Sequence, residues 1–320
     1  MDWKKIKTEE RNERTANIDT LSTLDMVRLI NDEDKKVALA VEKEAERIAA
    51  AVDVIAAQLK EGGRLIYCGC GTSGRLGVLD AVECPPTFGV TDQEVIGLIA
   101  GGEGAFVKAK EGAEDDEAQG GRDLDAIGLT ARDTVIGLTA SGRTPYVLGA
   151  LRRAREAGCR TAAISCNRGA RASALADAAV EVHTGPEVLS GSTRLKAGTA
   201  QKMILNMIST ASMVGVGKVY QNLMVDVRQT NQKLVRRAEN IVMQSTGCTW
   251  GEAAQALREA GGEAKPAVVK LLLGTDIETA RRLLDRAEGS VRRAVAEQPC
   301  VKGDAPSTGY TQTKQKEELK

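Results

Sequence analysis

Five short apolar runs, separated by segments with helical periodicity, constrain the fold of this chain more than any other feature of its sequence. Strands that helices cover on both faces are apolar throughout, and strands that alternate with helices form a parallel sheet. The runs predict strands at 64–68, 95–99, 134–139, 161–165 and 178–183. The chain is therefore expected to have an α/β fold built on a doubly wound, five-stranded parallel sheet.

A small, polar loop follows each predicted strand, and five strands favour the flavodoxin-like arrangement. The loops read GCGTSGR, AGGEGA, ASGRTP, CNRGAR and TGPEVLSGSTRLKAGT. Ligands of doubly wound sheets bind beyond the carboxyl ends of the strands, where such loops gather. The sequence thus predicts a ligand site at that edge of the sheet.

The remaining segments indicate an arm, a helical appendage and a tail. Residues 1–33 are expected to form a polar N-terminal arm, and residues 34–60 show the periodicity of one helix. The α/β domain is expected to span 34–231, and shorter segments over 232–298 indicate a small helical domain. Residues 299–320 lack periodicity, which is typical of a disordered tail.

Local signals place three helix starts in the small helical domain. Thr249 and Glu252, like Thr275 and Glu278, have the spacing of a capping box, in which each side chain bonds the other residue's backbone N–H. Pro266 suits a first helical turn, where its missing N–H has no helical partner.

The composition excludes several classes of function. The 44 basic and 44 acidic side chains balance, so no charge excess points to nucleic acid or to a membrane surface. No apolar segment approaches the length of about 18 residues that spans a bilayer. Seven cysteines without a secretory leader indicate a cytoplasmic protein with reduced thiols. One histidine and a lone C-x-C pair leave no zinc-like ligand set, so no metal is expected.

The segment Gly69–Gly74 reads GCGTSG and fits the G-x-G-x-x-G pattern of dinucleotide-binding folds. Those folds also place an acidic residue at the end of the second strand, where it binds a ribose hydroxyl. Here that strand ends in GLIAGGE, so the carboxylate of Glu103 comes late. The pattern alone therefore does not specify a nucleotide.

A second loop rich in hydroxyl groups, TASGRT at 139–144, follows the third predicted strand. Two such loops at one edge can surround a phosphate with hydroxyl and backbone N–H donors, and a helix that begins at Pro145 adds its positive end. Ser73, Ser141 and Thr144 are the candidate phosphate ligands. The alternative is that these residues are ordinary N-caps, a common use of Ser and Thr.

The two loops resemble those of sugar isomerase (SIS) domains, which bind phosphosugars, and longer motifs make the resemblance closer. GTSGRLGVLDAVECPPTFGV, EGAEDD, ASGRTPYV, SGSTRLKAGTAQKMILNM and GKVYQNLMVDV resemble the N-acetylmuramic acid 6-phosphate etherases. The likeness extends from Thr8 to Glu297 with the expected order and spacing. CGCGTSG and CNRGA depart from the family's usual wording, but neither departure touches a candidate catalytic residue.

The resemblance implies a lyase that needs no cofactor. It would cleave the D-lactyl ether of N-acetylmuramic acid 6-phosphate to N-acetylglucosamine 6-phosphate and D-lactate, in the recycling of bacterial cell-wall sugars. The family's two catalytic glutamates carry over to Glu83, in AVECPPT, and Glu114, in EGAEDD. The expected substrate-binding residues are Gly71, Thr72, Ser73, Ser141, Gly142, Arg143, Thr144 and Ser192.

The implied roles follow the chemistry of the elimination. One group must remove the proton on carbon 2, and another must protonate the departing lactate, so the two pKa values must differ. The family's pattern gives Glu83 the acid role and Glu114 the base role, although the pair is better supported than the assignment of roles. An acid at neutral pH needs a raised pKa, so Glu83 is expected to be partly desolvated.

Other polar residues have weaker functional interpretations. His183 could act as a base at the ligand edge, although a structural histidine is the simpler reading. Cys84 lies beside Glu83 but lacks a histidine partner, so we interpret it as a packing residue. Arg143 and Arg194 could bind the phosphate or the lactyl carboxylate, or form surface ion pairs.

Two other functions remain open. The chain could be a non-catalytic sensor of phosphosugars, although both glutamates favour an enzyme, or an aldose–ketose isomerase, against which ECPPT argues. SIS domains usually pair, so a homodimer is expected, with the helix over 34–60 and the long apolar helix after residue 196 as candidate contact surfaces. The arm over 8–24 is a candidate to complete the neighbouring subunit's site.

Overall fold

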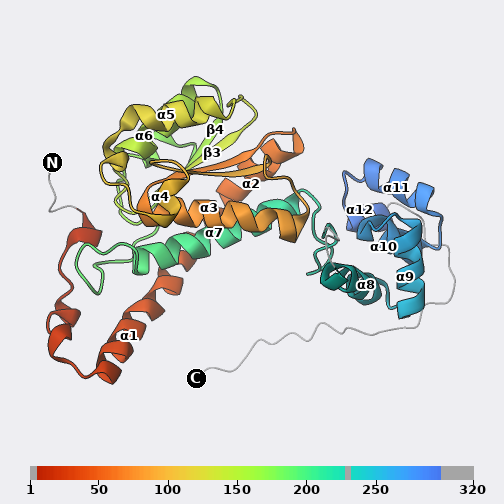
Figure 1. Ribbon diagram of the computed structural model, residues 1–320, viewed down its shortest axis with the longest axis horizontal. Coiled ribbons are helices and arrows are strands. Elements are labelled where there is room, and N and C mark those ends of the chain that lie inside the picture. Colours follow the sequence, from red (N-terminus) through yellow and green to blue (C-terminus); the bar gives the residue numbers. More distant parts are fainter. Residues whose placement is uncertain (1–5, 228–231, 297–320) are drawn as a thin grey trace.

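The computed structural model describes residues 6–227 and 232–296, and its α/β part is built on five parallel strands in the order β2-β1-β3-β4-β5 (Figure 1). The strands are β1 (Leu65–Gly69), β2 (Val95–Ile99), β3 (Thr134–Thr139), β4 (Arg160–Ser165) and β5 (Ala178–Glu181). All neighbouring strands pair in parallel. This order confirms the predicted flavodoxin-like sheet, and the predicted strands end within two residues of the observed ones.

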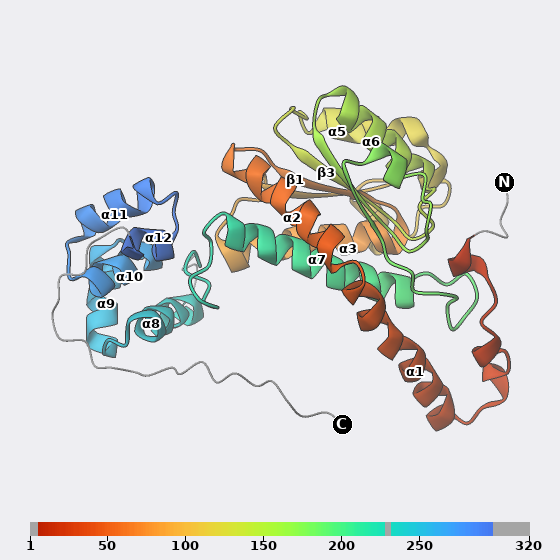
Figure 2. The same ribbon diagram turned by 180° about the vertical axis from the view of Figure 1, so that it is seen from behind.

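Helices cover both faces of the sheet (Figures 1 and 2). The helices on one face are α2 (Ala45–Lys60), α3 (Gly71–Phe88) and α7 (Lys196–Gly215), and those on the other are α5 (Glu117–Ala126) and α6 (Pro145–Glu156). Successive residues of a strand point to opposite faces. Leu65 and Tyr67 of β1 therefore enter the first core, and Ile66 and Cys68 enter the second.

The single helix expected over 34–60 is wrong in extent, because two helices occupy this region. Helix α1 (Thr23–Glu42) begins eleven residues earlier than expected, and the Ser22 hydroxyl caps it by accepting a hydrogen bond from the Asp25 N–H. The break at residues 43–44 contains neither glycine nor proline, so no sequence signal marks it. The later part of α1 packs on the core through Val37 and Val41, whereas its first turns project from the domain (Figure 2).

A buried carboxylate joins α1 to the arm and to α7. Glu33 is 1% exposed and accepts hydrogen bonds from Asn12 (3.1 Å), Arg14 (2.7 Å), Lys36 (2.6 Å) and the buried Lys196 (2.9 Å). Burial alone would raise the pKa of this carboxyl, but the hydrogen bonds from Lys36, Lys196 and Asn12 outweigh it and lower the pKa to about 2. The arm is thereby tied to the helices beneath the sheet.

Short elements occupy the arm and the loops at the carboxyl edge. The arm contains the 3-10 turns η2 (Lys7–Glu9), η3 (Glu13–Thr15) and η4 (Ile18–Thr20). The loops contain α4 (Gly104–Val107), η5 (Ala113–Asp115) and η6 (Ser173–Leu175). The Thr15 hydroxyl donates to the Val188 carbonyl (2.8 Å), so the arm lies beside the loop between β5 and α7 (Figure 1).

A third hydrophobic core lies among the C-terminal helices, separate from the sheet. These helices are α8 (Gln232–Thr246), α9 (Trp250–Glu259), α10 (Ala264–Leu273), α11 (Ile277–Arg286) and α12 (Val291–Ala296). Val225 and Val227 join this core, so the segment before residue 228 packs with the helices. The predicted division at 231/232 therefore stays a prediction, and the expected disorder of 299–320 lies outside the described residues.

The four last helices repeat one helical pair, a relation that the sequence analysis missed. The offset is 27 residues, from Ala253 to Ala280. The identical pairs are Ala253 and Ala280, Leu257 and Leu284, Ala260 and Ala287, Gly262 and Gly289, Ala267 and Ala294, and Val268 and Val295. Gly262 (φ +90°) and Gly289 (φ +74°) both turn the chain between the two helices of a pair.

The repeat also corrects one predicted cap. The capping box at Thr249 and Glu252 is confirmed, since both of its hydrogen bonds are present. The box at Thr275 is wrong by one residue, because Asp276 caps α11 and accepts from the Thr279 N–H. Asp276 is the counterpart of Thr249 in the repeat. Pro266 lies in the first turn of α10, as predicted.

Among the helices of residues 6–227 and 232–296, none combines the length and the apolar character that a membrane span requires.

Candidate active site

The first hydroxyl-rich loop joins β1 to α3 by a very tight turn. A Cβ atom on Gly69 would lie 2.7 Å from the Gly74 nitrogen, and one on Gly74 would lie 2.6 Å from the Gly69 carbonyl oxygen. Any larger side chain at either position would push the helix away from the strand. These two glycines therefore allow α3 to pack closely on β1. The close packing brings Thr72 and Ser73 to the end of the sheet.

The second loop joins β3 to α6 and is stabilised by its own hydroxyl groups. The Thr139 and Thr144 hydroxyls lie 2.8 Å apart, and the Gly142 N–H donates to the Thr139 oxygen. The Arg143 N–H donates to the Ser141 oxygen (3.2 Å). The Thr144 side chain makes no capping bond to α6, although Thr144 precedes the helix.

The alternative explanation of the three candidate ligands as N-caps is not supported by these contacts. Ser73 lies within the first turn of α3 and donates instead to Gln201 (2.9 Å). Ser141 forms a bond inside its own loop, and Thr144 leaves the first turn of α6 uncapped. The N–H groups at the start of α6 are thus available to an anion.

One cavity of about 460 Å³ lies between the two loops. The predicted site residues that line it are Gly71, Thr72, Ser73, Glu114, Ser141, Arg143 and Thr144. Gly142 is buried in the second loop, and Ser192 lies between two lining residues, Gly191 and Thr193. Seven predicted residues from separate parts of the sequence are therefore brought together, and the glutamate that accompanies them is Glu114.

Glu114 stands where two cavities meet. It belongs to η5 and is exposed, and it also lines a neighbouring cavity of about 260 Å³ that shares Cys70 and Gly71. The Arg75 guanidinium steadies this region by donating to the carbonyls of Ala105 and Phe106. Burial, with the charges of Glu114 and Asp115, raises the pKa of the Cys70 thiol to about 12, so this thiol stays neutral.

Glu83 lies apart from this cavity in the same chain. It is exposed on α3, ten residues beyond Ser73, which corresponds to about 15 Å along a helix axis. The adjacent Val82 side chain is 64% exposed and Leu79 is 40% exposed. The expectation that Glu83 is partly desolvated is therefore wrong for the single chain.

Four residues had weaker functional interpretations, namely His183, Cys84, Arg143 and Arg194. Of these, Arg143 lines the cavity and the other three do not. Burial, followed by the charges of Arg168 and Lys7, lowers the pKa of His183, which does not line the cavity. Cys84 is buried and donates to the Asp80 carbonyl (3.3 Å), and burial raises the pKa of its thiol to about 12. These contacts agree with a packing role. Among the described residues, no three His, Cys, Asp or Glu side chains are grouped as metal ligands are.

Two kinds of site residue escaped the sequence analysis. Ile6 and Glu9 of the arm line the cavity, and Gln201 of α7 accepts the Ser73 hydrogen bond from beneath it. Gln201 is 1% exposed, and its Nε2 has no hydrogen-bond partner among the described residues. No local spacing marks these residues, because each reaches the site through a long-range contact.

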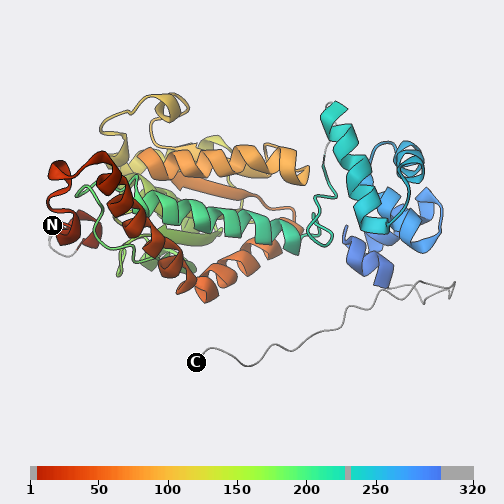
Figure 3. The ribbon, with the colours of Figure 1, turned by 90° about the horizontal axis from the view of Figure 1, so that it is seen from below.

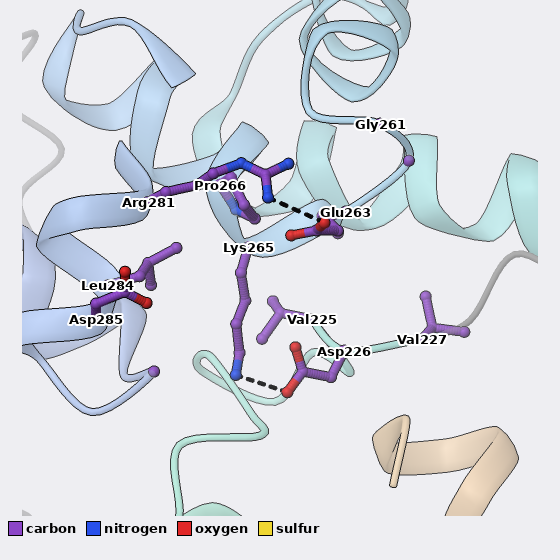
Figure 4. A pocket seen from close by; sticks show the side chains of 13 residues that line it. Val225, Asp226, Val227, Gly261, Glu263, Lys265, Pro266, Arg281, Leu284 and Asp285 are labelled. Carbon is purple, nitrogen blue, oxygen red and sulfur yellow. Dashed lines mark hydrogen bonds and ion pairs between the residues drawn. The ribbon is translucent and has the colours of Figure 1, made fainter. Parts of the chain in front are cut away.

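A larger cavity, of about 720 Å³, lies beside the C-terminal helices and carries none of the predicted site residues. Four of its five charged side chains form two ion pairs, and Asp285 has no ion pair among the described residues (Figure 4). Lys265 lies 2.6 Å from Asp226, and Arg281 lies 3.2 Å from Glu263. Because both of its cations already have acidic partners, the smaller cavity at the sheet edge is the better candidate for a phosphate site.

Part of the chain is similar to a domain of a known family and to solved structures. Residues 47–155 match the family model described as "Glucokinase regulatory protein N-terminal SIS domain". A phosphoheptose isomerase from Francisella tularensis is similar in structure over 61% of this chain and 100% of its own, with 15% identity and a TM-score of 0.45. That score is low, so the fold assignment rests on the strand order.

Relatives of nearly full length give the family. The chain is 57% identical over 295 residues to the N-acetylmuramic acid 6-phosphate etherase of Mycolicibacterium smegmatis, covering 92% of this chain and 99% of the relative. The etherase of Yersinia pestis is 59% identical over 288 residues, which cover 90% and 98% of the two chains. This chain belongs to the N-acetylmuramic acid 6-phosphate etherase family.

Proposed function

We propose that this chain is a carbon–oxygen lyase that cleaves N-acetylmuramic acid 6-phosphate to N-acetylglucosamine 6-phosphate and D-lactate. The observation that carries the proposal is identity above 50% with etherases over about nine-tenths of the chain. The site at the sheet edge supports it with hydroxyl-rich loops and a glutamate in one cavity. The reaction would serve the recycling of cell-wall sugars in the bacterial cytoplasm.

The sugar phosphate would bind between the two loops. Hydroxyls of Ser73, Ser141 and Thr144 and the uncapped first turn of α6 are donors that suit the phosphate oxygens. Arg143 lines the same cavity and supplies a positive charge. Thr72, Ser192 and the backbone of Gly71 and Gly142 would hold the rest of the ligand.

The cleavage proceeds by elimination and hydration. In the open-chain sugar the carbon 1 aldehyde makes the carbon 2 proton acidic, and a carboxylate removes it. The carbon 3–oxygen bond then breaks, and a second carboxyl group gives its proton to the departing lactate oxygen. Water adds to carbon 3 of the unsaturated aldehyde, and carbon 2 regains a proton. No cofactor takes part in these steps.

Glu114 is the base that this cavity offers, and Glu83 must come from another copy of the chain. Because Glu83 is about 15 Å along α3 from Ser73, it cannot serve the cavity of its own chain. Its surroundings suit an interface, since Leu79 and Val82 on α3 and Met207 on α7 are large apolar side chains left exposed. Figure 3 shows α3, α7 and α1 along one face.

A homodimer through this face would carry Glu83 of each subunit toward the other subunit's cavity. Association would also remove water from Glu83, and desolvation raises the pKa of a carboxyl group. The proton donor that the elimination needs would then exist only in the dimer. We therefore expect Glu83 to be partly desolvated in the dimer, although it is exposed in the single chain.

The alternative is a sensor that binds phosphosugars without cleaving them. The match of residues 47–155 to the regulatory-protein model keeps this alternative in view. The near-complete coverage of etherases favours the enzyme. An assay of purified protein separates the two functions, because a sensor binds the substrate but releases no lactate.

The test is incubation with N-acetylmuramic acid 6-phosphate and measurement of D-lactate with time. The wild-type chain should release lactate, and Glu114→Gln and Glu83→Gln should each lose about 10²- to 10⁴-fold in rate. Glu111→Gln is a matched control, since it changes a neighbouring carboxylate in the EGAEDD loop. Lactate release at the wild-type rate by Glu114→Gln would remove that residue's role, and none from the wild type would overturn the proposal.

A further inference from the structure

The start of the N-terminal arm is fixed to the loops of the candidate active site. The Thr8 N–H donates to the Asn167 side-chain oxygen (3.3 Å), and the Asn167 amide donates back to the Thr8 hydroxyl (3.0 Å). The same amide also donates to the Ala140 carbonyl (2.9 Å), next to Ser141. Thr8 and Ile6 are almost fully buried. The arm and the second phosphate loop therefore share one anchor.

Glu9 directly follows this anchor and lines the cavity between the two loops. Its carboxylate contacts the loop before α7, because a Cβ atom on Gly191 would lie 3.1 Å from Glu9 Oε2. Gly191 also has a φ of +77°, which a side chain would strain. The loop thus passes close to the Glu9 carboxylate, and Glu9, although exposed, is one of the side chains that line the site.

The Glu9 carboxylate has no hydrogen bond or ion pair to any described residue. The nearby Lys7 ammonium pairs with Glu10 instead (2.7 Å). A carboxylate is an acceptor with two oxygens, so it favours a ligand that offers hydrogen-bond donors. A phosphate would be repelled by this carboxylate, so the part of the ligand that contacts Glu9 is expected to be the sugar and not the phosphate.

We infer that Glu9 binds the substrate by accepting hydrogen bonds from the sugar's hydroxyl or amide N–H groups. This inference rests on the proposed function, because it takes the sugar phosphate as the ligand. Glu9 then determines specificity: the three hydroxyl side chains hold the phosphate that all sugar phosphates share, and Glu9 recognises the sugar. The arm is in this way part of its own chain's site.

The test is calorimetric binding of two probes, N-acetylglucosamine 6-phosphate and inorganic phosphate, to the full-length chain. Glu9→Ala should weaken binding of the sugar phosphate by about tenfold or more, since it removes hydrogen bonds to a charged group, and should leave inorganic phosphate within about twofold. Glu9→Gln keeps one acceptor oxygen and should lie between. Glu10→Gln, whose residue pairs with Lys7 and does not line the cavity, is the matched control and should bind both probes as the wild type does.

Binding does not depend on turnover, so the two proposals can fail separately. A wild-type chain that binds the sugar phosphate but releases no lactate overturns the proposed function and leaves the role of Glu9 to the variants. Unchanged sugar-phosphate binding by Glu9→Ala overturns the role of Glu9. Equal weakening of both probes also overturns it, because that result means the arm has detached. Absence of sugar-phosphate binding to the wild type overturns the role of Glu9, whereas the proposed function is decided by lactate release.

Discussion

The cavity at the sheet edge and the larger cavity beside the C-terminal helices differ in how their charges are satisfied. At the sheet edge, the carboxylates of Glu9 and Glu114 form no hydrogen bond or ion pair with the described residues. Beside the C-terminal helices, Lys265 and Arg281 each have an acidic partner. The larger volume is thus the worse guide, although the largest pocket is the usual first hypothesis for a site. At the larger cavity Asp285 alone among the charged lining residues lacks an ion pair to a described residue, and no Ser or Thr lines that cavity beside it.

Mixing two inactive variants should give the largest effect at the sheet edge. If Glu83 comes from the partner subunit, a dimer of Glu83→Gln with Glu114→Gln contains one site with both glutamates and one with neither. An equal mixture that reassociates at random should then recover about a quarter of the wild-type rate of lactate release. Each variant alone should remain 10²- to 10⁴-fold below the wild type, by rough expectation for a lost acid or base.

The control for this experiment is a mixture of each variant with itself, treated identically. Continued inactivity of the mixed sample, with heterodimers demonstrated by differently sized tags, would contradict the shared site. It would mean that both glutamates act from one chain, and the geometry of α3 would then have to change on binding.

Gln201 lies beneath the cavity at the sheet edge, and its buried Nε2 has no hydrogen-bond partner among the described residues. In the free chain the Ser73 hydroxyl donates to Gln201 Oε1. For this hydroxyl to donate to phosphate, the amide must turn over, so that Nε2 donates to the Ser73 oxygen. Gln201→Glu cannot make that exchange, and should weaken binding of N-acetylglucosamine 6-phosphate by about 10- to 100-fold.

Gln201→Met is the matched variant, since it keeps the volume and removes both polar ends. Its loss should be smaller, about tenfold or less, because Ser73 is then free to turn toward the phosphate. Calorimetric titration measures both. Gln201→Glu that binds as tightly as the wild type would show that Ser73 donates nothing to the ligand.

Unlike Glu9 and Glu114, the Glu33 carboxylate has several hydrogen-bond partners. We therefore expect a substitution of Glu33 to change the free energy of unfolding. A pKa lowered from 4.5 to about 2 corresponds to on the order of 3 kcal/mol of stability at neutral pH. This contribution is complete above about pH 4.5 and is lost as the pH falls toward 2. Glu33→Gln should therefore lower the free energy of unfolding at pH 7, and the difference from the wild type should shrink in acid.

Urea unfolding at pH 7 and pH 3 measures this difference. Asp32→Asn changes an exposed carboxylate of the same helix and should leave the midpoint nearly unchanged at both pH values. A Glu33→Gln midpoint that differs from the wild type equally at both values would contradict the assigned pKa.

The smallest effect is expected at the larger cavity. Lys265→Met removes the Asp226 ion pair, but Asp226 keeps Lys218 at 3.4 Å. Lactate release should stay within about twofold of the wild type, because the change is far from the sheet edge. A tenfold fall in the rate with an unaltered unfolding transition would give the C-terminal cavity a part in function.

The sheet and its loops could be predicted from the sequence because their signals are local. Apolar runs mark the strands, and the loops after β1 and β3 carry their hydroxyl groups within a few residues. The break between α1 and α2 could not be predicted, since residues 43–44 carry no helix-breaking residue. Thr275 and Asp276 are both good N-caps, and only the 27-residue repeat chooses the second.

The site could be predicted in part for the same reason. The family resemblance and the loops identify Ser73, Ser141 and Glu114, which the fold brings together. Gln201 and Glu9 were missed because they approach the loops from α7 and from the arm, and sequence spacing does not report such contacts. Whether Glu83 is exposed depends on which face of α3 points away from the sheet. A sequence motif does not determine that orientation.

The anchor between Thr8 and Asn167 also has a consequence for the order of folding. The two residues are 159 positions apart, and the loop that passes Glu9 comes later still. Closing so long a loop costs chain entropy that only a largely formed domain can offset. A ribosome must therefore release most of the α/β domain before the arm can dock. The residues that line the cavity at the sheet edge extend to Thr193, so a chain that ends before this residue has no complete site.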